Sequence, residues 1–291
     1  MPPPVAVVTD STAYLPPEEV SRLGIVVVPL QVVVGGRSFD DTAWIDGASM
    51  GDALRERGRV TTSRPAPRRF TDAYREAADR GATGIVSVHL SAEMSGTVEA
   101  ARAGAEGSPV PVTVVDSGSI AMGLGFPVLA AASAAAGGAT RTEVADAARR
   151  RAESVRSFFY VDTLEYLRRG GRIGAAETLL GSALMIKPIL HISGGTIVPL
   201  EKVRTASRAI ARLEDLAVEA AGAGAGPVEI AVQHLGARSR AETLAARLRG
   251  RIPSLTEVIV VEVGSIIGAH VGPGMLGITV SSRESLTSSE P

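Results

Sequence analysis

The sequence predicts an α/β protein of two lobes, the first of which is built on a parallel β-sheet. Apolar runs of strand length, such as Gly84–Leu90 and Val112–Val115, alternate with helical patterns along most of the chain. These runs are continuously apolar, which is typical of strands that helices cover on both faces. The chain of 291 residues exceeds one typical domain. We therefore expect one lobe at residues 1–155, a second at 156–283, and a flexible tail at 284–291.

In the first half, proline near the start of a helical pattern and glycine at its end mark the helices. The expected strands are Val5–Thr9, Ile25–Val34, Gly84–Leu90 and Val112–Val115, and the expected helices are Pro16–Gly24, Pro67–Arg80, Gly96–Ala105 and Ile120–Ala136. Parallel sheets bind ligands at the carboxyl ends of their strands. The loops after Val8, Leu90 and Val115 are therefore the expected location of a site.

The second half begins with a short strand at Phe158–Val161 and a helix at Thr163–Arg169. Gly194-Gly195 is a two-residue turn signal between two extended runs, so Ile186–Ile192 and Thr196–Val203 are expected to form a hairpin. From Thr205 to Val263 the pattern is helix, strand, helix and strand. The second lobe is therefore also α/β.

Composition excludes several classes of function. The formal net charge is −1 and no basic block is present, so we expect no nucleic-acid partner. The absence of cysteine excludes disulfides and thiolate chemistry, and the four histidines are too far apart for a compact metal motif. No apolar run approaches the roughly 20 residues that cross a bilayer. The first residues lack a secretory pattern, so we expect a cytoplasmic protein without a metal or cofactor.

A polar segment between a buried strand and a helix is the sharpest local feature. Ser95 and Thr97 flank the expected helix start, with Gly96 between them. A helix N-terminus presents unpaired N–H groups and partial positive charge, which suits a carboxylate or phosphate. The alternative is that Ser95 only caps the helix.

Two further segments are candidates for the same anion. The hydroxyl groups of Thr62 and Ser63 precede the helix at Pro67, where they would either donate to the anion or organise a turn. His270 lies in a glycine-rich segment after a strand and would either donate to an anion or serve the structure alone. Asp10 and Asp116 end strands, where they would either line the floor of a cleft or cap helices, and we favour caps.

Three arginines, Arg168, Arg169 and Arg172, lie at an expected helix end and glycine turn. Cations at this position complement the helix dipole. An exposed arginine loop also suits a phosphate group or an acidic partner. Both interpretations stay open.

Taken in order, these segments resemble the DegV family of bacterial fatty-acid-binding proteins, from Val5 to about Val280. The resemblance rests on Val8-Thr9-Asp10-Ser11-Thr12, Thr62-Ser63, Leu90-Ser91, Met94-Ser95-Gly96-Thr97, Val115-Asp116-Ser117, Leu164 to Ile173, and His270-Val271-Gly272-Pro273-Gly274. It implies the two-lobed DegV fold, with a long-chain fatty acid such as hexadecanoate in a buried tunnel between the lobes. It also implies a carrier without catalytic residues of its own.

The resemblance assigns roles to individual residues. Thr62 and Ser95 correspond to the hydroxyls that bind the carboxylate and His270 to a nearby histidine, with Ser63, Gly96 and Thr97 beside them. Better-understood members present the acid to a separate kinase, which makes an acyl phosphate. Arginines that match Arg172 and Arg204 serve that encounter. Arg64 stands where the resemblance leads us to expect glutamine.

Elementary energetics agree with a lipid ligand. A carboxylate in an apolar interior is costly unless it is hydrogen-bonded, and converging hydroxyls supply those bonds. Each buried methylene contributes roughly 0.8 kcal/mol. The hydrocarbon would therefore supply most of the affinity, and the hydroxyls would set its orientation.

Two rival interpretations use the same residues. In the first, the protein is a hydrolase or acyl transferase in which Ser95 is the nucleophile and His270 the base, with Asp10 or Asp116 orienting the histidine. In the second, it is a regulatory module that senses a different small anion.

Overall fold

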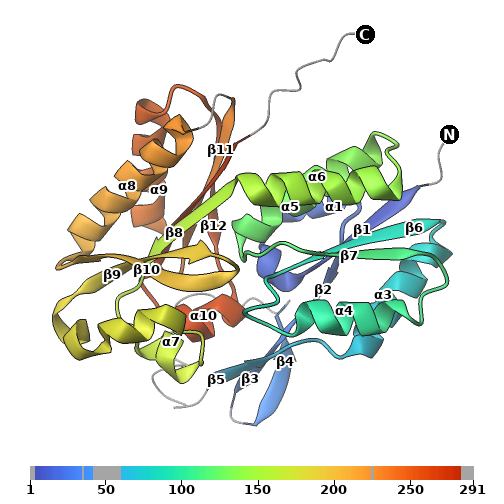
Figure 1. Cartoon of the computed structure of the whole chain (residues 1–291), viewed down its shortest axis with the longest axis horizontal. Coiled ribbons are helices and arrows are strands. Elements are labelled where there is room, and N and C mark those ends of the chain that lie inside the picture. Colours follow the sequence, from blue (N-terminus) through green and yellow to red (C-terminus); the bar gives the residue numbers. More distant parts are fainter. Residues whose placement is uncertain (1–3, 35, 42–59, 224–225, 283–291) are drawn as a thin grey trace.

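The computed structural model describes residues 4–34, 36–41, 60–223 and 226–282, and the expected tail at 284–291 lies outside them. Two α/β bodies lie side by side, and a small third sheet lies below them in the view of Figure 1. The predicted fold class is confirmed. The domain division at residue 155 stays a prediction, although helix α6 ends at Ser154 and strand β8 starts at Val155.

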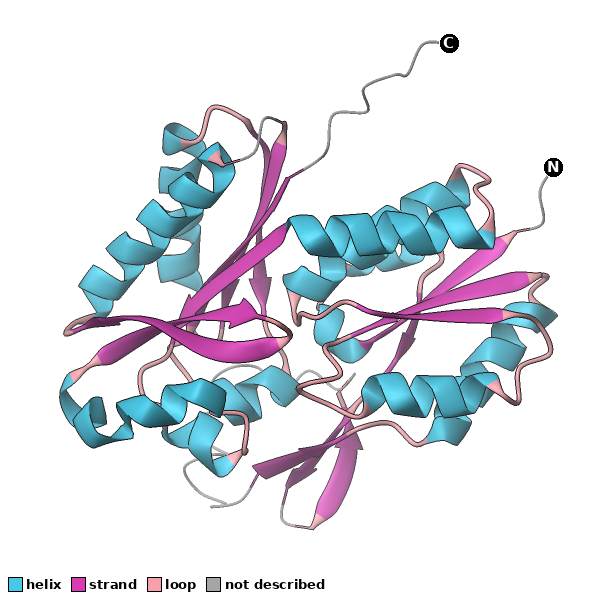
Figure 2. Ribbon diagram, viewed as in Figure 1, coloured by secondary structure: helices cyan, strands magenta, loops and turns pink. Residues whose placement is uncertain are grey.

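The first sheet is parallel, in the order β2-β1-β6-β7. Its strands are β1 (Val5–Asp10), β2 (Val26–Val28), β6 (Gly84–His89) and β7 (Val112–Asp116). Figures 1 and 2 show helices on both faces of this sheet, which explains its continuously apolar strands. One face carries α5 (Met122–Ala136) and α6 (Arg141–Ser154); the other carries α3 (Pro67–Asp79) and α4 (Thr97–Ala105), while α1 (Pro17–Leu23) contacts α5.

The expected strand Ile25–Val34 is wrong as a single element. Only β2 joins the parallel sheet, and the chain leaves it before Pro29, which has no backbone N–H to donate to a ladder. The segment then forms β3 (Gln31–Val34), the centre of a separate antiparallel sheet with β4 (Arg37–Asp40) and β5 (Val60–Ser63). The segment that carries Thr62 is therefore a strand and not a turn.

Helix α6 was not among the expected elements, although its sequence signal is present. Thr140 accepts a hydrogen bond from the backbone N–H of Glu143, and the Glu143 carboxylate accepts one from the backbone N–H of Thr140. This capping box is a start signal of the S/T-x-x-E type.

The second sheet has six strands in the order β10-β9-β8-β13-β11-β12. They are β8 (Val155–Tyr160), β9 (Lys187–Ser193), β10 (Thr196–Val203), β11 (Val228–His234), β12 (Leu255–Glu262) and β13 (Leu276–Ser282). The predicted hairpin is confirmed as β9–β10, and both turn glycines have positive φ. The sequence pattern missed β13, which lies between β8 and β11.

The remaining helices cover the second sheet. Figure 1 shows α8 (Ala206–Gly222) and α9 (Arg238–Arg251) on its outer side. Three shorter helices lie at its lower end: α7 (Glu165–Arg169), the 3₁₀ segment η2 (Gly174–Met185) and α10 (Ser265–Val271). A 3₁₀ turn, η1 (Ser11–Ala13), follows β1. The inner side of the sheet faces α5, where Met122 and Phe126 pack against Ala231.

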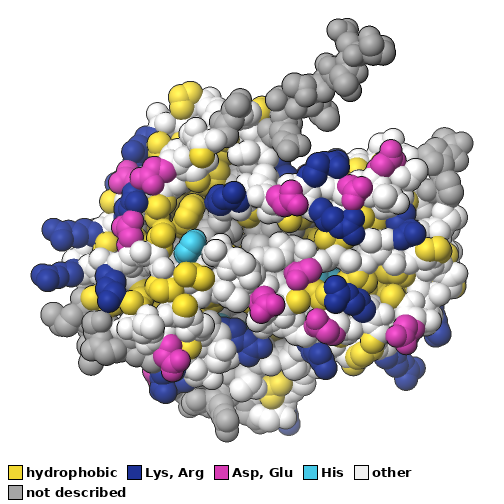
Figure 3. All heavy atoms as spheres, in the orientation of Figure 1, with side chains coloured by type: hydrophobic (Ala, Val, Ile, Leu, Met, Phe, Trp, Pro, Cys, Tyr) yellow, Lys and Arg dark blue, Asp and Glu magenta, His cyan; other side chains and the backbone are white. Residues whose placement is uncertain are grey.

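The surface agrees with the near-neutral charge. On the face shown in Figure 3, Lys and Arg side chains are interspersed with Asp and Glu side chains. Among the described helices, we find none with the combined length and apolar character of a membrane span.

Candidate functional site

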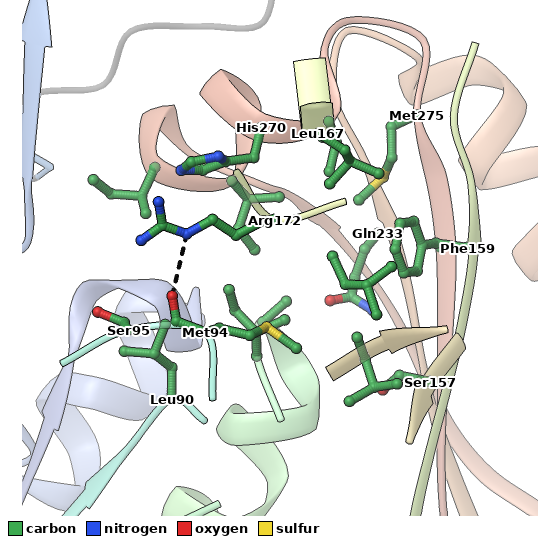
Figure 4. A pocket seen from close by; sticks show the side chains of 18 of the residues that line it. Leu90, Met94, Ser95, Ser157, Phe159, Leu167, Arg172, Gln233, His270 and Met275 are labelled. Atoms are coloured by element: carbon green, nitrogen blue, oxygen red, sulfur yellow. Dashed lines mark hydrogen bonds between the residues drawn. The ribbon is translucent and has the colours of Figure 1, made fainter. Parts of the chain in front are cut away.

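A mainly apolar pocket lies between the two bodies of the protein. The space not filled by atoms in this pocket and at its open mouth amounts to ≈ 870 Å³. The first half of the chain contributes β5 and the loops after β6 and β7, and the second half contributes strands β8, β11 and β13 and helix α10. Leu90, Phe159 and Met275 are among its apolar walls (Figure 4). A ligand here would contact residues from both halves of the sequence.

One end of this pocket gathers the polar residues that the sequence predicts. Thr62, Ser63, Ser95 and His270 all line it. Thr62 Oγ1 and His270 Nε2 share a hydrogen bond of 2.8 Å, although 208 positions separate the two residues in the sequence. The tertiary structure therefore brings together segments that sequence reasoning could only associate by resemblance.

The serine and glycine before α4 adjoin the same end. Gly96 is the N-cap of α4 and no side chain caps this helix, so the interpretation of Ser95 as a cap is wrong. Ser95 Oγ instead shares a 2.8 Å hydrogen bond with Thr97 Oγ1. Thr97 is fully buried and lies outside the pocket lining. The Ser95 hydroxyl is thus held at the start of α4, where the first N–H groups of the helix favour an anion.

A buried carboxylate positions the loop that carries Ser95. Asp10, at the end of β1, accepts hydrogen bonds from the backbone N–H groups of Thr12 and Leu90, both at 3.0 Å. Its second oxygen lies 3.0 Å from Nδ1 of His89, and Nε2 of His89 lies 2.7 Å from the Ser87 hydroxyl. The predicted capping role of Asp10 is confirmed. Asp10 also joins the ends of β1 and β6, directly before the loop of Ser95.

The same loop is attached to the second lobe. The Ser91 hydroxyl donates to the backbone oxygen of Gly195 at 2.7 Å. Gly195 is part of the β9–β10 turn, and a Cβ added there would come within 2.6 Å of Ser91 Oγ. The hairpin turn therefore lies directly on the loop that presents Ser95.

Two arginines lie at the polar end of the pocket. Arg172 donates through Nε to the backbone oxygen of Met94 at 3.2 Å, which joins the two halves of the chain (Figure 4). Arg64 donates to the backbone oxygen of Gly96 at 3.3 Å and occupies the space that a Cβ at Gly96 would need. Both arginines line the pocket. Arg204 lies between β10 and α8 and is exposed like Arg64 and Arg172, but it lies outside the lining.

Burial favours the neutral form of the histidine in this pocket. Desolvation, with a smaller contribution from the Arg172 guanidinium, lowers the pKa of His270 to about 4. Its Nδ1 is buried and has no hydrogen-bond partner among the described residues. If Nε2 carries the proton, His270 donates to Thr62, and the Thr62 hydroxyl is left free to donate to a ligand.

The geometry does not assemble the nucleophile and base of a hydrolase. His270 is bonded to Thr62, whereas Ser95 is bonded to Thr97. Asp10 is bonded to His89, and Asp116 accepts from the backbone N–H groups of Ala92 and Gly118. Within the described part of the chain, no carboxylate reaches His270, so the orienting group that the hydrolase interpretation requires is absent.

The sequence patterns missed several residues of the pocket. Ser157, Gln233 and Thr279 line it from three strands of the second sheet. Each lies within an extended run and belongs to no recognisable motif. Only the order of the strands brings them together.

Comparisons with known proteins agree with this architecture. The family model described as an uncharacterised protein family, DegV, matches residues 4–283. A DegV domain-containing protein of Streptomyces coelicolor is 58% identical over 279 residues, which are 96% of this chain and 99% of that protein.

Two solved structures resemble the whole chain. A DegV family protein of Thermus thermophilus, described by its fatty acid binding, has a TM-score of 0.90 at 33% identity and covers 96% of this chain and 100% of its own. DegV of Bacillus subtilis, a fatty acid binding protein, has a TM-score of 0.87 at 33% identity, with coverage of 97% and 100%. The sequence, the fold and these matches agree, and the chain belongs to the DegV family.

Proposed function

We propose that this protein binds a long-chain fatty acid, such as hexadecanoate, in the pocket between its lobes. The observation that carries the proposal is an apolar pocket with Thr62, Ser95 and His270 gathered at one end. The Thermus and Bacillus relatives bind fatty acids with the same fold, which supports the same ligand class here. The hydrocarbon of hexadecanoate contributes on the order of 11 kcal/mol gross, before ordering costs, at roughly 0.8 kcal/mol per methylene.

The carboxylate is assigned to the end that holds the hydroxyl groups. Thr62 and Ser95 would donate to it, and the N-terminus of α4 and the guanidinium groups of Arg64 and Arg172 would supply positive potential. These groups offset the desolvation of the charged headgroup. His270 would hold Thr62 in the donating orientation.

The direct test is to identify the lipid that accompanies the protein. Mass spectrometry of an organic extract of the purified protein should detect a fatty acid in near-stoichiometric amount. Delipidated protein should then bind hexadecanoate in a calorimetric titration. A protein that yields no fatty acid and binds none after delipidation contradicts the proposal.

Binding of the fatty acid should raise the pKa of His270. A nearby carboxylate favours the charged imidazolium, which opposes the effect of burial that lowers the pKa of His270 to about 4. Because binding then takes up protons, affinity should increase as the pH falls through the raised pKa of His270 toward about 4. NMR titration of the imidazole of His270 with and without hexadecanoate measures the shift directly.

His191 is the internal control for this titration. Burial also lowers its pKa, but it lies outside the pocket lining. Its pKa should therefore be the same with and without ligand. An unchanged pKa of His270 would place the carboxylate elsewhere in the pocket.

We further propose that the protein presents the bound acid to a separate fatty acid kinase, which forms the acyl phosphate. The pocket carries no assembled nucleophile and base, which favours a carrier over a hydrolase. Arg172, which lines the pocket, and Arg204, which lies outside it, would both serve the encounter with the kinase.

Replacing Arg204 with alanine should separate binding from presentation. Affinity for hexadecanoate should stay within twofold, because Arg204 lies outside the pocket. Acyl phosphate formation by an added bacterial fatty acid kinase with ATP should fall about tenfold, on the order of one lost charge-assisted contact. Arg208→Ala, at another exposed arginine nearby on α8, is the matched control and should behave as the wild type. Equal rates of acyl phosphate formation in the Arg204 and Arg208 variants would show that Arg204 does not contact the kinase.

A further inference from the structure

The side of the pocket formed by the second sheet is unexpectedly polar for a hydrocarbon site. Gln233 on β11, Thr279 on β13 and Ser157 on β8 all line the pocket, and the three strands are neighbours in the sheet. Ser157 and Thr279 are partners in the register of β8 and β13. Figure 4 shows Gln233 and Ser157 on the sheet side, away from Ser95 and His270. This polar group, here called the sheet-side cluster, is therefore distinct from the headgroup end.

The three side chains of the cluster form one hydrogen-bonded chain. Gln233 Nε2 donates to Thr279 Oγ1 at 2.8 Å, and Thr279 Oγ1 and Ser157 Oγ share a hydrogen bond of 3.0 Å. Gln233 Oε1 accepts from the backbone N–H of Met122 at 3.0 Å, at the first turn of α5. The hydrogen bond from Met122 therefore occupies the amide oxygen of Gln233, and the amide N–H₂ group points toward Thr279 in the neighbouring strand.

A count of hydrogen atoms shows that this chain has spare donors. The Gln233 amide has two N–H hydrogens and each hydroxyl has one, which makes four. The two hydrogen bonds among the three side chains use two of these. Among the described residues, no hydrogen bond of these three side chains uses the other two donor hydrogens.

A fourth hydroxyl lies beside the cluster. Ser119 Oγ is buried, its residue is 5% exposed, and it has no hydrogen-bond partner among the described residues. A Cβ added at Gly123 would overlap this oxygen and come within 3.0 Å of Ser157 Oγ. Ser119 and Ser157 therefore flank the same residue of α5. Ser119 does not line the pocket, so the donors that face a ligand are those of Gln233, Thr279 and Ser157. Buried donors without acceptors are unfavourable, and an acceptor oxygen from a ligand would satisfy these donors.

We propose that the sheet-side cluster is a subsite for an oxygen atom on the hydrocarbon chain of the ligand. The preferred ligands are then oxygenated fatty acids, which carry a hydroxyl or oxo group along the chain or at its far end. This inference rests on the proposed function and names the substrate class of the same pocket. A plain methylene chain leaves the spare donors unpaired, and a site built to hydrogen-bond a ligand oxygen discriminates against an analogue that lacks it.

The experiment compares each oxygenated acid with its unsubstituted parent. Calorimetric titrations of delipidated protein give dissociation constants for hexadecanoate, 16-hydroxyhexadecanoate, octadecanoate, 12-hydroxyoctadecanoate and 12-oxooctadecanoate. The quantity of interest is the dissociation constant of the parent divided by that of the oxygenated acid. In the wild type we expect this ratio to exceed one for at least one pair.

Two variants connect that ratio to the cluster. Thr279→Val keeps the side-chain shape but removes the central hydroxyl, and Ser157→Ala tests the same chain at a less buried position. Each should lower the ratio of the preferred pair at least threefold. Thr256→Val is the matched control, because Thr256 lies on β12 of the same sheet, outside the pocket. It should leave the ratio unchanged.

A wild-type ratio of one or less for every pair overturns the inference, as does a ratio that changes less than threefold in both cluster variants. The parent acids separate this result from failure of the proposed function. If wild-type protein binds hexadecanoate and octadecanoate but the ratios fail, only the oxygen subsite is refuted. If it binds none of the acids, fatty acid binding itself is refuted.

Discussion

Removing the two headgroup hydroxyls together, as Thr62→Val with Ser95→Ala, is expected to weaken hexadecanoate binding at least roughly 100-fold. A hydrogen bond to a charged group contributes about 1.5–3 kcal/mol, and each 1.4 kcal/mol is a factor of ten in the dissociation constant. The carboxylate in the pocket is removed from water, so without these donors its charge would be left unpaired, which weakens binding further. Titration of the delipidated variant with hexadecanoate gives the measurement.

Thr61→Val is the matched control for this variant. Thr61 is the exposed neighbour of Thr62 on β5, and its side chain points to the opposite face of the strand. Both proteins should unfold at temperatures close to that of the wild type, since Thr62 and Ser95 are only partly buried. Wild-type affinity in the double variant would show that these hydroxyls do not bind the headgroup.

Replacing Asp10 with alanine should have the largest effect on stability. The substitution removes the acceptor for the backbone N–H groups of Thr12 and Leu90 and for the hydrogen-bonding partner His89, all of which are buried. Each buried donor left unpaired costs about 1–3 kcal/mol, so we expect a loss of at least about 3 kcal/mol in the free energy of unfolding. Thermal unfolding should shift downward by about 6–12 °C for a protein of this size.

Asp116→Ala tests whether the loss of stability in the Asp10 variant arises because Asp10 is buried, or whether removing any carboxylate at a strand end has the same effect. Asp116 ends β7 as Asp10 ends β1, and it also accepts backbone N–H groups, but it is exposed. Its replacement should cost less than about 1 kcal/mol. The Asp10 variant should also bind hexadecanoate more weakly, since the loop of Ser95 follows Leu90. Equal stability of the two variants would show that the Asp10 network does not hold the site.

The sequence predicts an element correctly when the interactions that form it are between residues close together in the sequence. The helices at Pro67 and Thr97 and the β9–β10 hairpin depend on signals within a few residues, and the structure confirms them. Strand β13 was not predicted, because its position between β8 and β11 depends on partners far away in the sequence. Pro29 is a local signal that the expected strand ends there, but the apolar residues on either side of it suggested one continuous strand.

The candidate site divides in the same way. Ser95 could be predicted because the N-terminus of a helix has local chemistry, although the structure assigns its hydroxyl to Thr97 and not to the helix. Thr62 and His270 were candidates from their own segments, but their direct hydrogen bond could not be predicted, since nothing local relates two residues 208 positions apart. The Asp10 network and the sheet-side cluster required the packed strands.

By itself, then, the sequence determined the α/β class, the alternation of strands and helices that indicates a parallel sheet in the first lobe, and the presence of polar segments at strand ends. These follow from hydrophobic periodicity and from turn chemistry, which act over a few residues. Only the tertiary structure decided that Thr62 pairs with His270, that Arg172 joins the two halves, and that three strands gather polar side chains around the pocket. Such pairings depend on strand order and lobe packing, because these bring distant residues within hydrogen-bond reach.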